Sequence, residues 1–115
     1  MTRHTLTPAE REFLARPRGL ARIATVDSDG MPHVVPTGWK FDAEKGELLL
    51  TGRDVGNTQR VKHLAARPHA AVVIDGIDRS AGWKPWALMV RGHAHYDKAI
   101  DAVRLTPTAV VSWGI

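Results

Sequence analysis

Residues 20–51 read LARIATVDSDGMPHVVPTGWKFDAEKGELLLT and predict three consecutive β-strands joined by tight turns. Two clusters rich in Asp, Gly and other polar residues interrupt the stretch, and such residues are typical of tight turns. In the longest strand, alternation places the odd-numbered residues from His33 to Phe41 on one face. The expected strands and turns are, in order, Leu20–Val26, Asp27–Gly30, Pro32–Phe41, Asp42–Gly46 and Glu47–Thr51. The stretch therefore predicts an antiparallel β-meander.

The chain on either side of this meander predicts two helices and further strands. The first helix begins after Thr7, because Pro8 suits a first helical position and Glu10 completes a capping box with Thr7. A second helix is expected from Asn57, a good N-cap, to about Arg67. The remaining expected strands, with a loop over Gly76–Pro85, are Ala70–Asp75, Ala87–Tyr96, Ala102–Leu105 and Ala109–Trp113. Six to seven antiparallel strands with two helices predict a mainly β protein, a β-barrel rather than an open sheet.

Length and composition indicate one globular domain over residues 1–115. Hydrophobic residues make up 43% and charged residues 24% of the chain, which excludes a disordered protein. A chain of this size builds only a modest core, so we expect a second subunit to complete it. The absence of Cys excludes disulfides, thiolate metal sites and cysteine nucleophiles. No stretch approaches the roughly 20 apolar residues of a membrane span, and no signal peptide is visible, so we expect a cytoplasmic protein.

The charge balance favours an anionic partner. Lys and Arg number 16 against 12 Asp and Glu, for a formal charge of +4. Nucleic acid, an anionic membrane or a phosphorylated small molecule would suit this balance, and so would a basic surface that serves only solubility. Because the positive residues form no run or tail, we expect neither a nucleic-acid nor a membrane partner. Four Trp residues could stack on a planar ligand or simply pack.

The segment from Thr51 to Arg67 is the strongest candidate binding site. A strand leads through a Gly-containing loop to the start of a helix that carries Arg60 and Lys62. Unpaired backbone N–H groups and the helix dipole make such an end a natural phosphate site. Basic residues in a first turn oppose the dipole, and a bound anion would compensate. The alternative is a solvated helix with a basic face. The glycine spacing matches neither a Walker loop nor a dinucleotide fingerprint.

Two histidines could suggest a metal or haem. His93 and His95 share one face of a strand, but Arg91 shares that face and no acidic residue follows at matching spacing. We therefore expect surface or interface histidines and no metal site. Ser112 shows no nucleophile-elbow or triad signature, so hydrolase chemistry has no support.

Three groups of motifs resemble the pyridoxamine 5'-phosphate oxidase-like split-barrel family over nearly the whole chain. The opening hairpin is similar over residues 24–26 and 29–36 and at Trp39. The phosphate-contact helix and the following strand are similar over residues 50–52, 60–64 and 67–73. Residues 90–94, 105–107 and 112–115 resemble the deazaflavin (F420)-dependent branch of that family.

This resemblance implies an FMN-binding-type split barrel that forms a homodimer, with a flavin-type cofactor between the subunits. The cofactor phosphate would meet basic and hydroxyl side chains at Thr51, Arg53, Thr58, Arg60 and Lys62. The cofactor ring would lie along Pro36, Thr37, Gly38 and Trp39, with Trp113 approaching from the dimer interface. The link Asp97–Asp101 is shorter than usual for the family, which affects the substrate side of the pocket.

The function implied is F420-dependent oxidoreductase chemistry, with hydride transfer to a small-molecule substrate that the sequence does not identify. Since the cofactor ring carries this chemistry, no catalytic side chain is named. The alternatives are an FMN-dependent oxidoreductase and a non-enzymatic flavin- or haem-binding protein. A barrel that binds single-stranded nucleic acid is a further alternative, but aromatic residues interleaved with basic ones are not evident.

Overall fold

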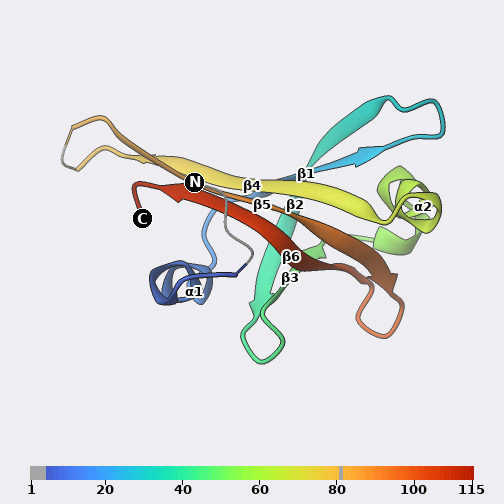
Figure 1. Cartoon of the computed structure of the whole chain (residues 1–115), viewed down its shortest axis with the longest axis horizontal. Helices are drawn as coiled ribbons and strands as arrows, with labels where there is room; N and C mark the ends of the chain where they lie inside the picture. The colour runs from blue at the N-terminus through green and yellow to red at the C-terminus, as the bar shows by residue number, and fades with distance from the viewer. Residues whose placement is uncertain (1–4, 81) are drawn as a thin grey trace.

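The computed structural model of the protein describes residues 5–80 and 82–115 and shows a barrel of antiparallel strands with helices at its ends (Figure 1). Six strands close the barrel in the order β1-β2-β3-β6-β5-β4. The strands are β1 Ala21–Val26, β2 Pro32–Asp42, β3 Glu47–Thr51, β4 His69–Asp78, β5 Lys84–Asp97 and β6 Ala102–Trp113. The helices are α1 Pro8–Leu14, the short 3-10 helix η1 Val55–Asn57 and α2 Gln59–Ala66. The mainly β class and the meander β1-β2-β3 are confirmed.

The sequence prediction was wrong about the extent of β4 and β5. Both ends of the expected loop Gly76–Pro85 are paired, because the ladder that joins Asp75 to Ala87 continues to Asp78 and Lys84. The two strands leave the barrel as a long hairpin, which projects beyond the closed part (Figure 1). Outside the core an amphipathic pattern is not needed, so alternation could not reveal this extension.

The two strands expected at the C-terminus are one strand, β6, which passes through Pro107. Pro107 pairs with Gly92 where the register between β5 and β6 shifts next to Arg91. Proline lacks the N–H that a regular ladder needs, and a bulge is a place where a strand tolerates it. A Cβ atom on Gly92 would lie 1.9 Å from the carbonyl oxygen of Thr106. The close approach of β5 to β6 at the bulge therefore requires glycine at position 92.

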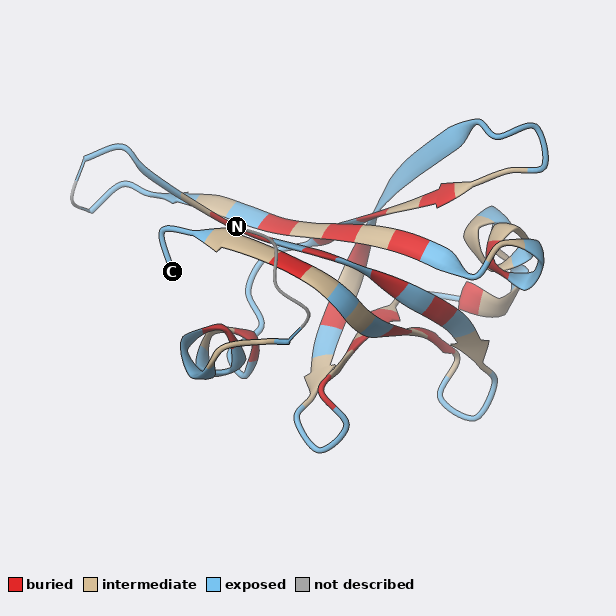
Figure 2. Ribbon diagram, in the orientation of Figure 1, coloured by how far each residue is buried: buried red, intermediate tan, exposed pale blue. Residues whose placement is uncertain are grey.

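The core fills the barrel from alternate positions of every strand, as the buried residues in Figure 2 show. In β5 the prediction that Leu88, Val90, Gly92, Ala94 and Tyr96 share one face is confirmed by their burial relative to the residues between them. In β2, Thr37 and Trp39 face inward, whereas His33 and Val35 lie on the exposed part of the β1–β2 hairpin. The side chains thus alternate along the whole of β2, but only its second half contributes to the core.

The helix α1 is attached at the end of the barrel where the C-terminus lies (Figure 1). The predicted capping box is present: Glu10 N donates to Thr7 Oγ1 at 3.1 Å, and Thr7 N donates to Glu10 Oε1 at 2.8 Å. Ser112 Oγ donates to the other oxygen of the buried Glu10 carboxylate at 2.5 Å, which joins α1 to β6. Within residues 5–80 and 82–115, no helix has the length and apolar character needed to cross a membrane.

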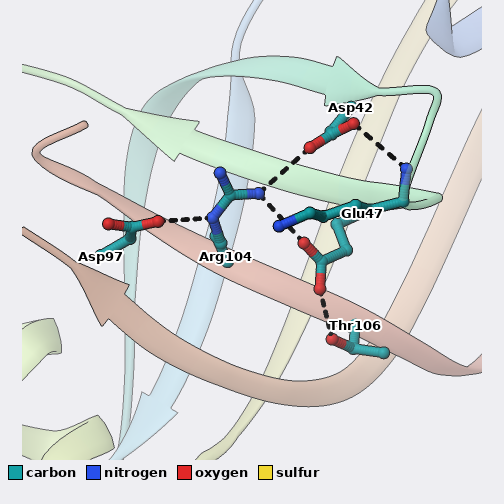
Figure 3. Close-up of polar contacts among 6 residues, drawn as sticks. Asp42, Glu47, Asp97, Arg104 and Thr106 are labelled. Atoms are coloured by element: carbon teal, nitrogen blue, oxygen red, sulfur yellow. Dashed lines mark hydrogen bonds and ion pairs between the residues drawn. The ribbon is translucent and has the colours of Figure 1, made fainter. Parts of the chain in front are cut away.

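A polar cluster around Arg104 connects four strands at one side of the barrel (Figure 3). Arg104 donates to Asp97 at 2.7 Å, and to Asp42 and Glu47 at 3.1 Å each. The hydrogen bond from Arg104 lowers the pKa of Asp97 below its ordinary value, so this carboxylate is ionised at neutral pH. Arg104 therefore links the ends of β2, β3, β5 and β6, which no local sequence pattern indicates.

Candidate functional site

The candidate site is built on the connection from β3 to α2, which we call the β3–α2 loop (Gly52–Thr58). Asn57 was expected to cap the second helix, but it closes the 3-10 helix η1 and the N-cap position belongs to Thr58. The Thr58 hydroxyl does not cap the helix, because it donates to the Val55 carbonyl at 2.7 Å. A left-handed residue, Asp54, begins η1 with φ +53°. The helix therefore starts one residue later than expected, with Thr58 rather than Asn57 at the N-cap position.

The side chain of Arg60, in the first turn of α2, extends back over this loop. A Cβ atom on Gly52 would lie 3.4 Å from Arg60 Nη2, so the guanidinium group rests against the glycine backbone. Arg60 Nε is buried and has no hydrogen-bond partner among residues 5–80 and 82–115, and no described carboxylate pairs with this guanidinium. Burial lowers the pKa of Arg60 below its ordinary value. A half-buried cation without a counter-charge is unfavourable by itself, and a bound anion would compensate for it.

Thr51 and Gly38 form the end of the β2–β3 ladder, directly before Gly52 in the chain. The two residues are partners in the register, and a Cβ atom on Gly38 would lie only 2.7 Å from Thr51 Oγ1. The inward-facing Thr37 hydroxyl donates to the Thr51 carbonyl at 2.6 Å and fixes the strand end from inside the barrel. The structure therefore places the Gly38–Thr51 pair directly before Gly52, against which Arg60 rests, and each glycine leaves room for the side chain beside it.

The other predicted site residues differ in exposure and in their place on the barrel. Arg53 is exposed on the β3–α2 loop next to Gly52, and Pro36 is exposed on β2. The Trp39 side chain is only 5% exposed and packs in the core, with its indole Nε1 buried and unpartnered among the described residues. Trp113 is 49% exposed and pairs with Ala87 at the α1 end of the barrel. A role for Trp113 at the site would need a second subunit.

Lys62 lies on a different side of α2 from Arg60, because helical residues two positions apart do not face each other. It lines a hollow of about 400 Å³ between α2 and the β1–β2 turn, together with Asp27, His33, His63 and Arg67. His63 Nδ1 is 2.8 Å from Thr25 Oγ1, and His33 Nε2 is 2.8 Å from Asp27 Oδ2. The hydrogen bond to His33 lowers the pKa of Asp27 to about 2. Sequence reasoning missed this cluster, since His33 and His63 come from distant elements.

The histidines of β5 lie on its outer face, as predicted. His93 and His95 are exposed, and the His93 ring lies against that of its cross-strand partner His69, with 5.0 Å between the ring centroids and 49° between the ring planes. Within residues 5–80 and 82–115, no group of three or more His, Asp or Glu side chains is arranged to hold a metal ion. The described part of the chain therefore has an imidazole pair, His69 and His93, on this face.

The fold and this group of residues define a split barrel with a cationic, glycine-lined corner beside its third strand. The family model for pyridoxamine 5'-phosphate oxidase matches residues 6–112, and the chain belongs to that family.

Similar proteins include reductases and flavin binders. A curated 5a,11a-dehydrotetracycline/5a,11a-dehydrooxytetracycline reductase of Streptomyces rimosus is 30% identical over 110 residues, covering 87% of this chain and 78% of the relative. A solved structure named F420 reductase has a TM-score of 0.63 at 19% identity, covering 96% of this chain and all (100%) of its own. The FAD-binding protein of Mycobacterium smegmatis also has a TM-score of 0.63, at 22% identity, covering 98% of this chain and 99% of its own. The two structures show the shared fold.

Proposed function

We propose that the protein is an F420-dependent oxidoreductase that reduces a small organic molecule. The observation that carries this proposal is Arg60, a half-buried guanidinium that rests on Gly52 without an anionic partner among the described residues. The reductase relative and the F420 reductase of similar fold support this choice. An FMN-dependent oxidoreductase of the same fold is the alternative.

The residues present suit a cofactor that carries a phosphate. Arg60 would bind the phosphate with charge-assisted hydrogen bonds, and the Thr51 hydroxyl would add a contact. Thr58 would add another by exchanging its hydrogen bond to the Val55 carbonyl for one to the phosphate. Arg53 would add a second positive charge at the exposed edge of the loop. Gly52 leaves the room that the Arg60 guanidinium occupies over the loop, and Gly38 leaves the room for the Thr51 hydroxyl. The outward side of β2 at Pro36 and Gly38 would support the ring, since the Thr37 and Trp39 side chains face the core, and Trp113 of a second copy would cover it.

When bound, a deazaflavin supplies hydride transfer from its ring, and the protein supplies position and electrostatics. The chain's own contribution is then to hold the phosphate, to orient the ring along β2 and to exclude water once the site is covered.

The choice between F420 and FMN can be made from the salt dependence of binding. F420 carries an acidic oligoglutamyl tail besides its phosphate, so exposed cations such as Arg53 would add affinity that salt screens. We expect F420 to bind more tightly than FMN at low salt and to lose more affinity at high salt in fluorescence titrations. Tighter FMN binding at both salt levels, or FMN retained through purification, would overturn the F420 assignment. Failure of both would instead favour haem or another ligand.

We also propose that the protein is a homodimer. A hollow of about 620 Å³ on the outer face of the barrel supports this, because its lining is mostly apolar and includes Val34, Met89 and Val111. Val34 is 67% exposed and Met89 41% exposed in the single chain. A second copy seated there would bury these side chains and complete a small core.

Sedimentation at micromolar concentration should show a dimer, and an interface of this kind should exceed about 2,000 Å² in total. Met89→Asp should shift the protein toward the monomer, because a carboxylate would be buried without a partner. The control Glu44→Lys changes a charge in the exposed β2–β3 turn and should leave the dimer intact. A stable, folded wild-type monomer under these conditions would refute the proposal.

A further inference from the structure

We propose that Asp101 is a positioning residue for the cofactor phosphate: it acts from the β5–β6 turn by holding the β3–α2 loop in the shape that places Arg60. This inference rests on the proposed function, because it concerns the same phosphate site. It also gives a role to the short Asp97–Asp101 link, which the sequence associated with the substrate side instead.

The Asp101 carboxylate accepts three hydrogen bonds, two of them from the backbone of the loop. Gly56 N donates to Oδ1 at 3.1 Å and Val55 N donates to Oδ2 at 3.3 Å. The Tyr96 hydroxyl donates to Oδ1 at 2.6 Å and is the largest cause that lowers the pKa of Asp101, so the carboxylate is ionised at neutral pH. An ionised acceptor makes stronger hydrogen bonds to backbone N–H groups than a neutral one.

The loop depends on this acceptor because it is drawn into the barrel. The Val55 side chain is 0% exposed and belongs to the core. A Cβ atom on Gly56 would lie 2.6 Å from the Tyr96 hydroxyl oxygen, so the loop packs directly on β5. At that depth an N–H group without an acceptor is costly. Asp101 itself holds a left-handed conformation, with φ +48°, to direct its carboxylate there.

The anchored residues lie between the two parts of the phosphate site. Gly52 and Arg53 precede Val55 and Gly56, and Thr58 and Arg60 follow them. The turn continues into α2 through hydrogen bonds from Asn57 N to the Asp54 carbonyl at 3.1 Å and from Thr58 N to the Val55 carbonyl at 3.0 Å. A shift of Val55 and Gly56 would therefore change how Arg60 lies over Gly52. Asp101 would touch no ligand, so its effect would pass through the loop.

Two variants separate the carboxylate from the backbone conformation at position 101. Asp101→Gly keeps the left-handed conformation and removes all three hydrogen bonds. Asp101→Asn tolerates the same conformation and keeps one acceptor oxygen. Lys98→Ala in the same turn is the matched control, because the Lys98 side chain is exposed. Each variant is titrated with F420 and with its phosphate-free deazaflavin core, and thermal unfolding verifies that it is folded.

We expect Asp101→Gly to weaken F420 binding by about tenfold, the equivalent of one lost hydrogen bond to the phosphate, while affinity for the phosphate-free core changes less than twofold. Asp101→Asn should recover most of the loss, and Lys98→Ala should match the wild type. Without ligand, the Val55 and Gly56 amides should exchange faster in Asp101→Gly. In an Arg60→Ala background, Asp101→Gly should have less than a twofold further effect on F420.

Three results would overturn the inference while leaving the proposed function in place. These are unchanged F420 affinity in a folded Asp101→Gly variant, equal weakening for F420 and its phosphate-free core, and a full additional loss in the Arg60→Ala background. Wild-type protein that binds neither F420 nor FMN would instead refute the proposed function, and with it the role of Asp101.

Discussion

Replacing Arg60 with Ala should weaken F420 binding from about tenfold to more than a hundredfold, since a charge-assisted hydrogen bond contributes roughly 1.5–3 kcal/mol. The same change should leave thermal stability unchanged or raise it, because the guanidinium is half-buried without an anionic partner among the described residues. Fluorescence titration and thermal unfolding of the same preparation measure the two effects. Weaker F420 binding together with unchanged or higher thermal stability would identify Arg60 as a binding residue.

Lys62→Ala is the matched control for this experiment. It removes a positive charge from the same helix, but Lys62 is exposed and lines the hollow with His33 and His63. We expect it to change F420 affinity by only a small factor at high salt, where exposed charges are screened. If Arg60→Ala binds F420 as the wild type does while remaining folded, Arg60 belongs to a solvated basic face and the candidate site is wrong.

The largest effect on stability is expected from Gly92→Ala in β5. The new methyl group would lie 1.9 Å from the Thr106 carbonyl oxygen, and this atom belongs to backbone that cannot rotate away. Either β6 must move or the bulge must be lost, at a cost of at least about 3 kcal/mol. For a domain of this size we expect the melting temperature to fall by roughly 10 °C or more.

Gly30→Ala separates this steric effect from the ordinary cost of replacing a glycine. Gly30 has φ +80°, but no atom lies within 4 Å of the position its Cβ would take. Only the backbone conformation opposes the change, at roughly 1–2 kcal/mol. If the two variants lose equal stability, the close approach of β5 to β6 at the bulge is not the reason for glycine at position 92.

Sequence patterns predicted the elements whose conformation depends on residues a few positions apart. Thr7 and Glu10 form the capping box that their spacing indicates, and turn residues separate β1, β2 and β3 where expected. Alternation identified the inward face of β5 correctly, because that face is buried along most of its length. These signals depend on neighbours within a few positions, which a sequence displays directly.

The remaining features depend on contacts between distant residues. Pro107 suggested a break between two strands, yet a bulge opposite Gly92 allows β6 to continue. Asn57 looked like a helix cap, but hydrogen bonds from Val55 and Gly56 to Asp101 hold this segment in η1. Single-sequence patterns contain no information on a carboxylate 45 residues away in the chain that fixes a loop. The length of the β4–β5 hairpin could not be predicted either, because the outer part of its ladder lies outside the core and needs no alternating pattern.

The sequence likewise indicated some residues of the candidate site and missed others. Thr51 and Arg60 were chosen from the strand–loop–helix pattern and the family resemblance, and the structure places them beside Gly38 and Gly52. Lys62 was chosen, like Arg60, as a basic residue near the start of the helix and from the family resemblance, but helical geometry turns it to another side of α2. Asp101 was missed because it contacts the β3–α2 loop from the distant β5–β6 turn and belongs to no recognisable sequence motif.

A crystal structure of the protein with F420 would test the account most directly. It should show the cofactor phosphate within hydrogen-bond distance of the Arg60 guanidinium, next to Gly52 and the Thr51 hydroxyl, with the ring along Pro36–Trp39 and Trp113 of a second copy nearby. A phosphate bound in the hollow of Lys62 and Arg67, or anywhere else away from Arg60, would contradict the central claim.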